Sequence, residues 1–192
     1  MIQKISPQIK AELVVGIDIE ETALKVAKKR NVMTVKCDLN VGGLPFRDNY
    51  FDLVLMSEVI EHIYNTDHIL LESRRVLKPF GYLLVSTPNL AWWLNRLVLL
   101  LGYQPYFTNV SVKYDVGKLF RHPLKTGCKG QHIRMFTFKA LRELLEFYSF
   151  RIIISRGVTS ELLPSFIRKI DKAIGHFSCS LGADIVLLAQ KL

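Results

Sequence analysis

Acidic and hydroxyl side chains follow three short apolar runs of the sequence. Asp18 follows the run 13–17, Asp38 follows 34–37, and Ser57 and Glu58 follow 52–56. Ligands of open α/β sheets bind at the carboxyl ends of the strands, so these side chains are expected to meet at a ligand site. A carboxylate after one strand can accept both hydroxyl protons of a ribose, and one after the neighbouring strand can accept from the exocyclic amine of adenine. The spacing therefore indicates a nucleoside site, and the alternative is that Asp simply favours turns and helix caps.

The elements that would position these residues alternate along the chain. Apolar runs predict strands at 13–17, 34–37, 52–56, 82–87, 150–155 and 183–189, and the run 53–56 is expected to be buried on both faces. Helices are predicted from about 20 to 30, from 67 to 78 before Pro79, and after an N-cap at Thr137. A loop or short helix is expected between the last two strands. The alternation predicts an α/β fold with a mostly parallel sheet and helices on both faces.

Length and composition limit the class of protein. At 192 residues, with 49% hydrophobic and 22% charged residues, the chain suits one soluble domain. The net charge of +9 favours anionic partners, such as nucleic acid or lipid head groups, without choosing among them. The three cysteines form no Cys-x-x-Cys pair, so we expect neither a disulfide framework nor a metal site, and a cytoplasmic location. We expect no signal peptide, and no run reaches the ~20 residues of a membrane span.

Several segments together resemble one known family. They are 15–19, 37–39, 44–46, 51–54, 58–63, 75–81, 86–89, 132–137 and 181–184. In this order and spacing they are similar to class I S-adenosylmethionine-dependent methyltransferases, and most of all to the group called methyltransferase type 11. The resemblance implies a three-layer, Rossmann-like sheet, mostly parallel with an antiparallel last strand, in a single domain over residues 1–192.

The resemblance also implies roles for the residues at the strand ends. The cofactor would be S-adenosyl-L-methionine. Asp18 and Ile19 would contact its ribose and adenine, Asp38 and Leu39 the adenine amine and ring, and Ser57 and Glu58 the methionine portion and the methyl group.

One part of the family pattern does not occur in this sequence. The family begins with a strand and a Gly-x-Gly-x-Gly-like loop, which lets the backbone approach the cofactor, whereas the first glycines here are Gly16 and Gly42. The first strand, which would be central, is therefore expected to be missing, and the cofactor is expected to bind weakly or not at all. We favour a recorded start internal to a longer protein over a decayed remnant, or over a gap filled by residues 1–10 or a second chain. A gapped sheet has edges that can pair with another chain, so a homodimer is one expectation.

Methyl transfer needs nucleophile, methyl carbon and sulfur in line, and a base where the acceptor carries a proton. The candidate bases are Glu58, Glu61, His62 and His132. His62 lies four residues after Glu58 and would share a helical face with it. The structural alternatives are a packed histidine at a helix start for His62 and a loop histidine for His132. No catalytic residue is assigned, because many such enzymes work mainly by positioning.

Residues 90–134 are expected to form a lid or insertion on the acceptor side. Aromatic and basic residues alternate there: Trp92, Trp93, Tyr103, Tyr106, Phe107, Lys113, Tyr114, Lys118, Arg121, His122, Lys125 and Lys129. This suits an anionic or aromatic small-molecule acceptor and leaves nucleic acid open as a partner. A mobile lid with a solvated basic face is the favoured interpretation. An amphipathic helix on a membrane surface fits less well, because its apolar residues run almost all round.

The leading hypothesis is a methyltransferase, truncated or degenerate, with a small-molecule acceptor. The alternative is a non-catalytic binding or partner module that keeps the fold. A nucleotide-binding oxidoreductase is disfavoured because there is no Gly-x-Gly-x-x-Gly segment.

Overall fold

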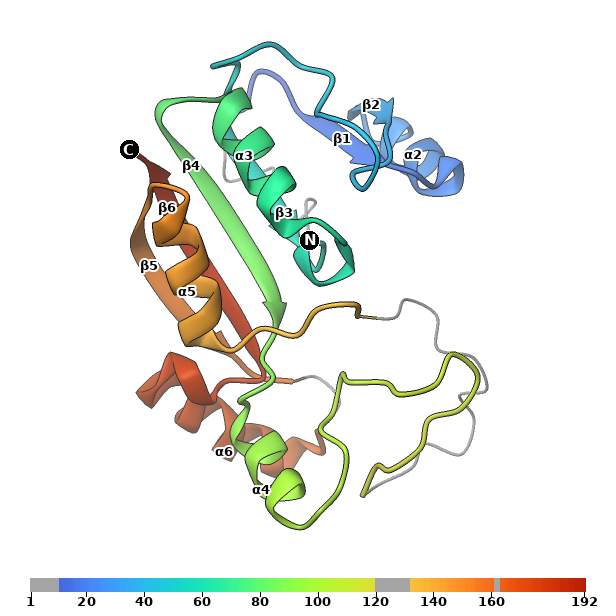
Figure 1. The fold of residues 1–192 in the computed structure, drawn as a ribbon, viewed down its shortest axis with the longest axis vertical. Helices are drawn as coiled ribbons and strands as arrows, with labels where there is room; N and C mark the ends of the chain where they lie inside the picture. The colour runs from blue at the N-terminus through green and yellow to red at the C-terminus, as the bar shows by residue number, and fades with distance from the viewer. Residues whose placement is uncertain (1–10, 120–131, 161–162) are drawn as a thin grey trace.

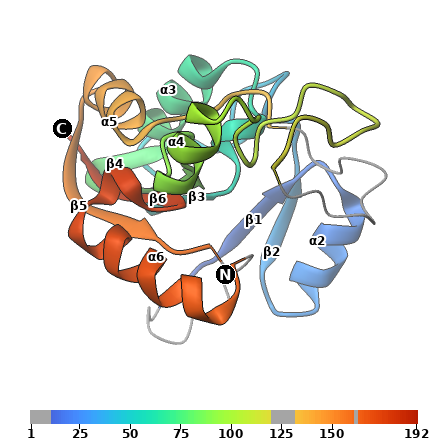
Figure 2. The same ribbon diagram turned by 90° about the horizontal axis from the view of Figure 1, so that it is seen from below.

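The computed structural model describes residues 11–119, 132–160 and 163–192 and has an α/β fold with its strands in two sheets (Figures 1 and 2). The smaller sheet pairs β1 (Val15–Asp18) with β2 (Met33–Lys36) in parallel, with α2 (Glu21–Lys28) between them in sequence. The larger sheet has the order β3-β4-β6-β5. Its strands are β3 (Phe51–Ser57), β4 (Leu77–Pro88), β5 (Phe150–Val158) and β6 (Asp184–Lys191).

Strand directions confirm the predicted α/β class. β3 is parallel to β4, and the last strand, β6, is antiparallel to both β4 and β5. The helices are α3 (Thr66–Val76), α4 (Trp93–Leu100), α5 (Phe138–Phe147) and α6 (Ser165–Phe177), with 3-10 turns η1 (Ile60–His62) and η2 (Cys179–Leu181). Figure 2 shows α3 and α5 on one side of the larger sheet and α6 on the other. The N-cap at Thr137 is confirmed, since its hydroxyl accepts from the Ala140 amide at 3.2 Å.

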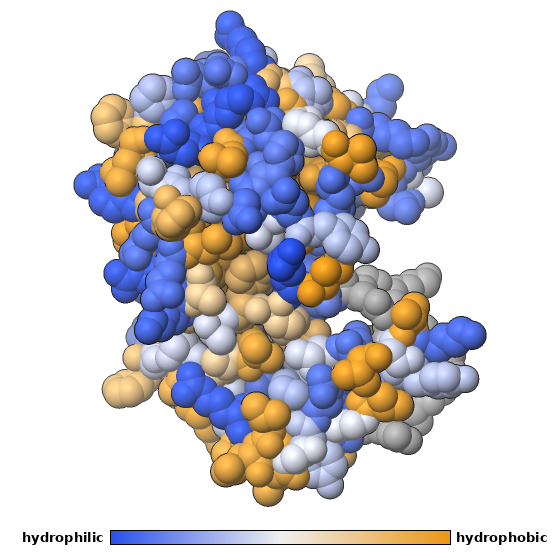
Figure 3. All heavy atoms as spheres, viewed as in Figure 1, coloured by the Kyte–Doolittle hydropathy of each residue, from blue (hydrophilic) through white to orange (hydrophobic). Residues whose placement is uncertain are grey.

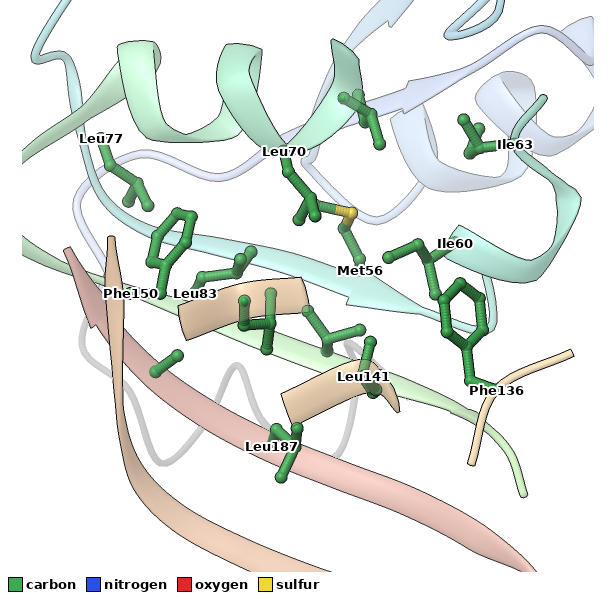
Figure 4. Packing of buried hydrophobic residues seen from close by; sticks show 14 of the residues in the cluster. Met56, Ile60, Ile63, Leu70, Leu77, Leu83, Phe136, Leu141, Phe150 and Leu187 are labelled. Carbon is green, nitrogen blue, oxygen red and sulfur yellow. The ribbon is translucent and has the colours of Figure 1, made fainter. Parts of the chain in front are cut away.

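The main core lies between the larger sheet and the pair α3 and α5 (Figure 4). On α3, Ile69, Ser73 and Val76 are buried at the i, i+4, i+7 spacing of one helical face. On α5, Leu141 and Leu145 are buried at the i, i+4 spacing of one helical face. These side chains meet Leu83 of β4 and Leu187 of β6, so apolar burial holds both helices on the sheet.

Two element predictions differ from the structure. The strand expected at 82–87 already begins at Leu77, and α3 ends at Val76, so Pro79 lies inside a strand. The loop or short helix expected before the last strand is the 13-residue helix α6. Its buried residues are Asp171 and Gly175, whereas its apolar residues Phe166, Ile170 and Phe177 repeat at helical spacing and are exposed.

The expectation that 53–56 is buried on both faces is wrong. Leu53 is 37% exposed, and Met56 is the buried residue of this run. The reason is strand pairing: within the described residues β3 pairs with β4 alone and β1 with β2 alone. No described strand joins the two sheets, at the position where the family's first strand was expected.

Arg75 fixes the loop that leads into β3. Its guanidinium donates to the carbonyls of Leu44 and Phe46 at 2.8 and 2.7 Å, and to the carboxylates of Glu72 and Asp48. Glu72 in turn accepts from the Leu44 amide at 2.7 Å and has its pKa lowered by the hydrogen bond from Arg75. The loop thereby has a defined path across α3 to the start of the strand.

Candidate functional site

The two aspartates of the smaller sheet lie at the same end of it. Asp18 is in register with Lys36, two residues before Asp38, and the Cys37 amide donates to the Asp18 carbonyl at 3.1 Å. One oxygen of each carboxylate closes a local turn, accepting from Glu20 and Asn40 amides at 2.9 Å. The turn role that we gave as the alternative is therefore real. Each carboxylate still has a second oxygen that could serve a ligand.

The apolar neighbours of these aspartates differ in exposure. Ile19 is 53% exposed directly beside Asp18, whereas Leu39 is half-buried and packs on the main core. An exposed, branched apolar side chain beside a carboxylate suits a ligand with a flat ring and a polar sugar.

Ser57 and Glu58 lie at the end of β3 and are joined to β4 by Ser86. The Ser57 and Ser86 hydroxyls are 3.3 Å apart, and Ser86 donates to Glu58 Oε1 at 2.8 Å. Glu58 has a φ of 55°, in the left-handed region that L residues seldom adopt. Ser86 was not among the predicted site residues, since only the register of β3 with β4 brings it here.

The expected helical pairing of Glu58 with His62 is wrong. Glu58 has a positive φ and is therefore not helical, and the 3-10 turn begins only at Ile60. His62 lies instead beside its neighbour Glu61, with Nε2 3.9 Å from Oε1.

Glu61, His62 and His132 form a cluster at the same end of the larger sheet, named here the EHH cluster. Their potential ligand atoms all lie within 4.8 Å of one another. His132 is brought there by the backbone, because the amides of Ile133 and Arg134 donate to the Glu61 carbonyl at 2.8 and 3.0 Å. Burial raises the pKa of Glu61, and burial lowers the pKa of His132. Two of the candidate bases thus adjoin each other although 70 positions separate His62 from His132 in the sequence.

Asp184, at the start of β6, is a further acidic group that was not among the predicted site residues. Burial, with the nearby charges of Glu58, Glu61 and Asp171, raises the pKa of its carboxyl to about 7. The end of the larger sheet therefore concentrates acidic side chains in a partly desolvated place.

Part of the segment 90–134 is structural. Trp92 is 2% exposed and packs on Leu163 and Ala183. Lys118 is also buried, and its ammonium donates to the carbonyls of Pro105 and Thr108. Trp92 and Lys118 therefore do not belong to an exposed aromatic and basic lid.

Three further lid residues, Trp93, Tyr106 and Phe107, are partly buried and pack on the same cluster as Trp92, whereas Lys113 is exposed. Tyr103 and Tyr114 are exposed, while Arg121, His122, Lys125 and Lys129 lie outside the described residues, as does Cys128. Figure 3 shows the surface hollowed between the part that carries α2 and the segment that follows α4. A separate hollow of about 410 Å³ lies between β5 and α6, lined by Arg156, Lys169, Lys172 and His176 among others.

In the parts that the structure describes, no helix has the length and apolar character to cross a bilayer.

The family model that this chain matches and two of the proteins similar to it are described as methyltransferases. The family model for the methyltransferase domain matches residues 3–85. A Mycobacterium tuberculosis protein named "Probable S-adenosylmethionine-dependent methyltransferase" is 35% identical over 79 residues, covering 41% of this chain and 29% of its own. The ubiquinone/menaquinone biosynthesis C-methyltransferase of Paraburkholderia phymatum is 38% identical over 81 residues, covering 39% and 32%. The matches thus span about a third of the length of these relatives.

Solved structures agree over nearly the whole chain. A SAM-dependent methyltransferase of Methanosarcina mazei superposes with a TM-score of 0.59 at 24% identity, covering 93% of this chain and 82% of its own. One of Thermotoga maritima gives 0.61 at 20% identity, covering 93% and 73%. The fold is the Rossmann-like fold of class I S-adenosylmethionine-dependent methyltransferases. The match to the methyltransferase domain model covers residues 3–85, which is less than half of the chain, and it agrees with this fold.

Proposed function

We propose that this chain is part of an S-adenosylmethionine-dependent methyltransferase that acts on a small molecule. The observation that carries the proposal is the placement of polar groups at the strand ends. Asp18 ends β1, Asp38 lies two residues after β2, and Ser57 ends β3 with Glu58 directly after it. These are the carboxyl ends at which open α/β sheets bind ligands.

Each group suits one part of the cofactor. Asp18 has a carboxylate for the ribose hydroxyls and exposed Ile19 for the adenine face. Asp38, with Leu39, serves the adenine amine and ring. Ser57 and Glu58, held by Ser86, face the methionine portion, whose amino group carries a positive charge that a carboxylate attracts.

Methyl transfer is a displacement at a sulfonium carbon, so alignment of the acceptor is the main requirement. Where the acceptor must lose a proton, His132 is the better placed of the two histidines. Burial lowers its pKa, which keeps the imidazole neutral near pH 7 and able to accept a proton. Its Nδ1 is bonded to the Phe107 carbonyl at 2.9 Å, so Nε2 would be the accepting nitrogen.

The acceptor side is assigned to the exposed part of 90–134. Tyr103 and Tyr114 offer aromatic surfaces, and the basic residues of the segment favour an anionic or aromatic molecule. The Paraburkholderia relative is named for C-methylation in quinone biosynthesis, which is compatible with an aromatic acceptor here.

The test is ligand-observed NMR with S-adenosylmethionine, which detects weak binding. Saturation-transfer signals from the ribose and adenine protons are expected for the unaltered chain and are expected to fall at least severalfold in Asp18→Asn and Asp38→Asn. Asp52→Asn is the matched control, because Asp52 is an exposed acid at the opposite end of β3, paired with Lys78 at 2.8 Å. Equal signals from all four proteins would refute the assignment.

A second candidate function is a non-catalytic partner module, which is favoured by the edges of β1 and β3 that pair with no other strand among the described residues. Unpaired strand edges are templates for pairing with another chain. This candidate predicts a stable homodimer or hetero-complex by light scattering together with no cofactor signal in the NMR experiment. Cofactor signals that depend on Asp18 would favour the methyltransferase.

A further inference from the structure

Three side chains of the EHH cluster offer ligand atoms of the kind that transition metals prefer. Glu61 and His62 come from η1, and His132 comes from the segment before α5. The two imidazole rings have centroids 5.0 Å apart, and Glu61 Oε1 lies 3.9 Å from His62 Nε2. Ligand atoms bind zinc at about 2.0–2.2 Å, so small side-chain rotations would bring these three atoms onto one ion.

One carboxylate oxygen of the EHH cluster, Glu61 Oε1, is buried without a hydrogen bond, from the part of the chain that the structure describes, to compensate for its lost hydration. Glu61 is fully buried, and its Oε2 accepts from the Thr87 hydroxyl at 2.9 Å. Its Oε1 has no hydrogen-bond partner among the described residues. A buried carboxylate oxygen left in this way costs free energy, which a bound cation would offset.

The groups around the cluster hold its members as metal ligands are held. The Phe107 carbonyl can only accept, so His132 Nδ1 carries the proton and Nε2 is the nitrogen with a lone pair. The Thr87 hydroxyl orients Glu61 from the other side. Hydrogen bonds from a ligand's other atom to a carbonyl or hydroxyl are the usual second layer of a metal site.

We propose that Glu61, His62 and His132 bind a divalent first-row transition-metal ion. Two imidazoles and one carboxylate favour such ions over Mg²⁺ or Ca²⁺, which prefer oxygen ligands. Three protein ligands leave at least one position for water or for an oxygen or nitrogen atom of a bound molecule. The sequence had predicted no metal site, since no close Cys or His spacing announces one. The metal proposal does not depend on the methyltransferase function. Where the ion is bound, His132 Nε2 is a ligand and is then not the proton acceptor.

The experiment uses the full chain without an affinity tag, stripped with a chelator and titrated with Zn²⁺ by calorimetry. One ion per chain is expected. Glu61→Gln, His62→Asn and His132→Asn are expected to weaken binding at least tenfold, since loss of an outer partner of a ligand alone weakens it about 10–100-fold. His176→Asn is the control, because His176 is exposed on α6 and lines the separate hollow there.

Visible absorption of bound Co²⁺ gives a second readout that does not depend on heats of binding. The spectrum of the unaltered chain is expected to be kept in His176→Asn and lost in His132→Asn. If Glu61→Gln fails to fold by circular dichroism, the two histidine variants decide. Absence of one-to-one binding in the unaltered chain, or equal binding in His132→Asn, would overturn the proposal.

Discussion

Asp171 is a buried carboxylate that receives donors from separate parts of the chain. The indole N–H groups of Trp92 and Trp93 each donate to its Oδ1 at 2.7 Å. Its Oδ2 accepts from the Thr159 hydroxyl and from the Ser160 amide. One residue of α6 thereby connects the start of α4 with the end of β5.

Replacement of Asp171 by Ala is expected to lower the free energy of unfolding by about 3 kcal/mol or more, because each orphaned buried donor costs ~1–3 kcal/mol. Urea unfolding followed by tryptophan fluorescence measures the change. The free energy of unfolding of Asp171→Asn is expected to lie between those of Asp171→Ala and the unaltered chain, since the Asn side chain keeps one acceptor oxygen. Glu143→Ala, at an exposed surface pair, should stay within about 0.5 kcal/mol of the unaltered chain. A loss for Asp171→Ala no larger than that of the control would contradict this role.

Asp184 predicts a pH dependence of stability. Burial raises its pKa from an ordinary 3.8 to about 7, so the folded chain binds this proton more tightly than the unfolded chain. Stability contributed by the protonated form is therefore present below pH 4 and lost as the pH rises toward 7. In chelator-treated protein, the stability of Asp184→Asn relative to the unaltered chain should increase between pH 4 and 7 and then level off. A difference that does not change with pH would show that Asp184 titrates normally.

At the scale of elements, β5, α6 and η2 approach so closely that only glycine fits. A Cβ on Gly182 would lie 2.6 Å from the Gly157 Cα and 3.0 Å from the Val158 amide nitrogen, and backbone cannot rotate away. Gly182→Ala is therefore expected to reduce the unfolding free energy by about 1–3 kcal/mol. Gly42→Ala is the matched control, because a Cβ there meets nothing within 4 Å. Thermal unfolding that is equally affected in both would be incompatible with this packing.

Elements with a strong apolar pattern could be predicted from the sequence. The strands β3, β4 and β6 could be predicted because each contains an apolar run, and the helices α3 and α5 because apolar residues recur along them at helical spacing. The length of α6 was missed although Phe166, Ile170 and Phe177 repeat at helical spacing, so this helix could have been predicted from the sequence. The exposure of Leu53 was missed because burial of a strand depends on its neighbours, which no local pattern reveals.

The candidate site likewise has residues that local sequence patterns indicate and residues that only the folded structure brings in. Asp18, Asp38, Ser57 and Glu58 could be predicted as site residues because each stands at the end of, or just after, a predicted strand, and this assignment stays a prediction. Ser86 entered through strand register, and the EHH cluster entered through a contact between η1 and a segment about 70 residues later. Sequence spacing indicates which residues end a strand, but it does not indicate which distant segments come into contact.

At the scale of the whole molecule, the described strands form two sheets that no described strand joins, and the proposed cofactor residues are divided between them. The smaller sheet carries Asp18 and Asp38, and the larger carries Ser57 and Glu58. Without a glycine-rich loop beside these ends, backbone contacts to the cofactor are fewer, which is why weak binding is expected.

The most direct measurement is an amide NMR titration of the isotopically labelled chain with S-adenosylhomocysteine, the demethylated cofactor. Chemical-shift changes are predicted at Asp18, Ile19, Asp38, Leu39, Ser57 and Glu58, with an affinity weaker than micromolar. Shifts confined to the hollow between β5 and α6, or no shifts at millimolar ligand, would contradict the placement of the cofactor at the strand ends.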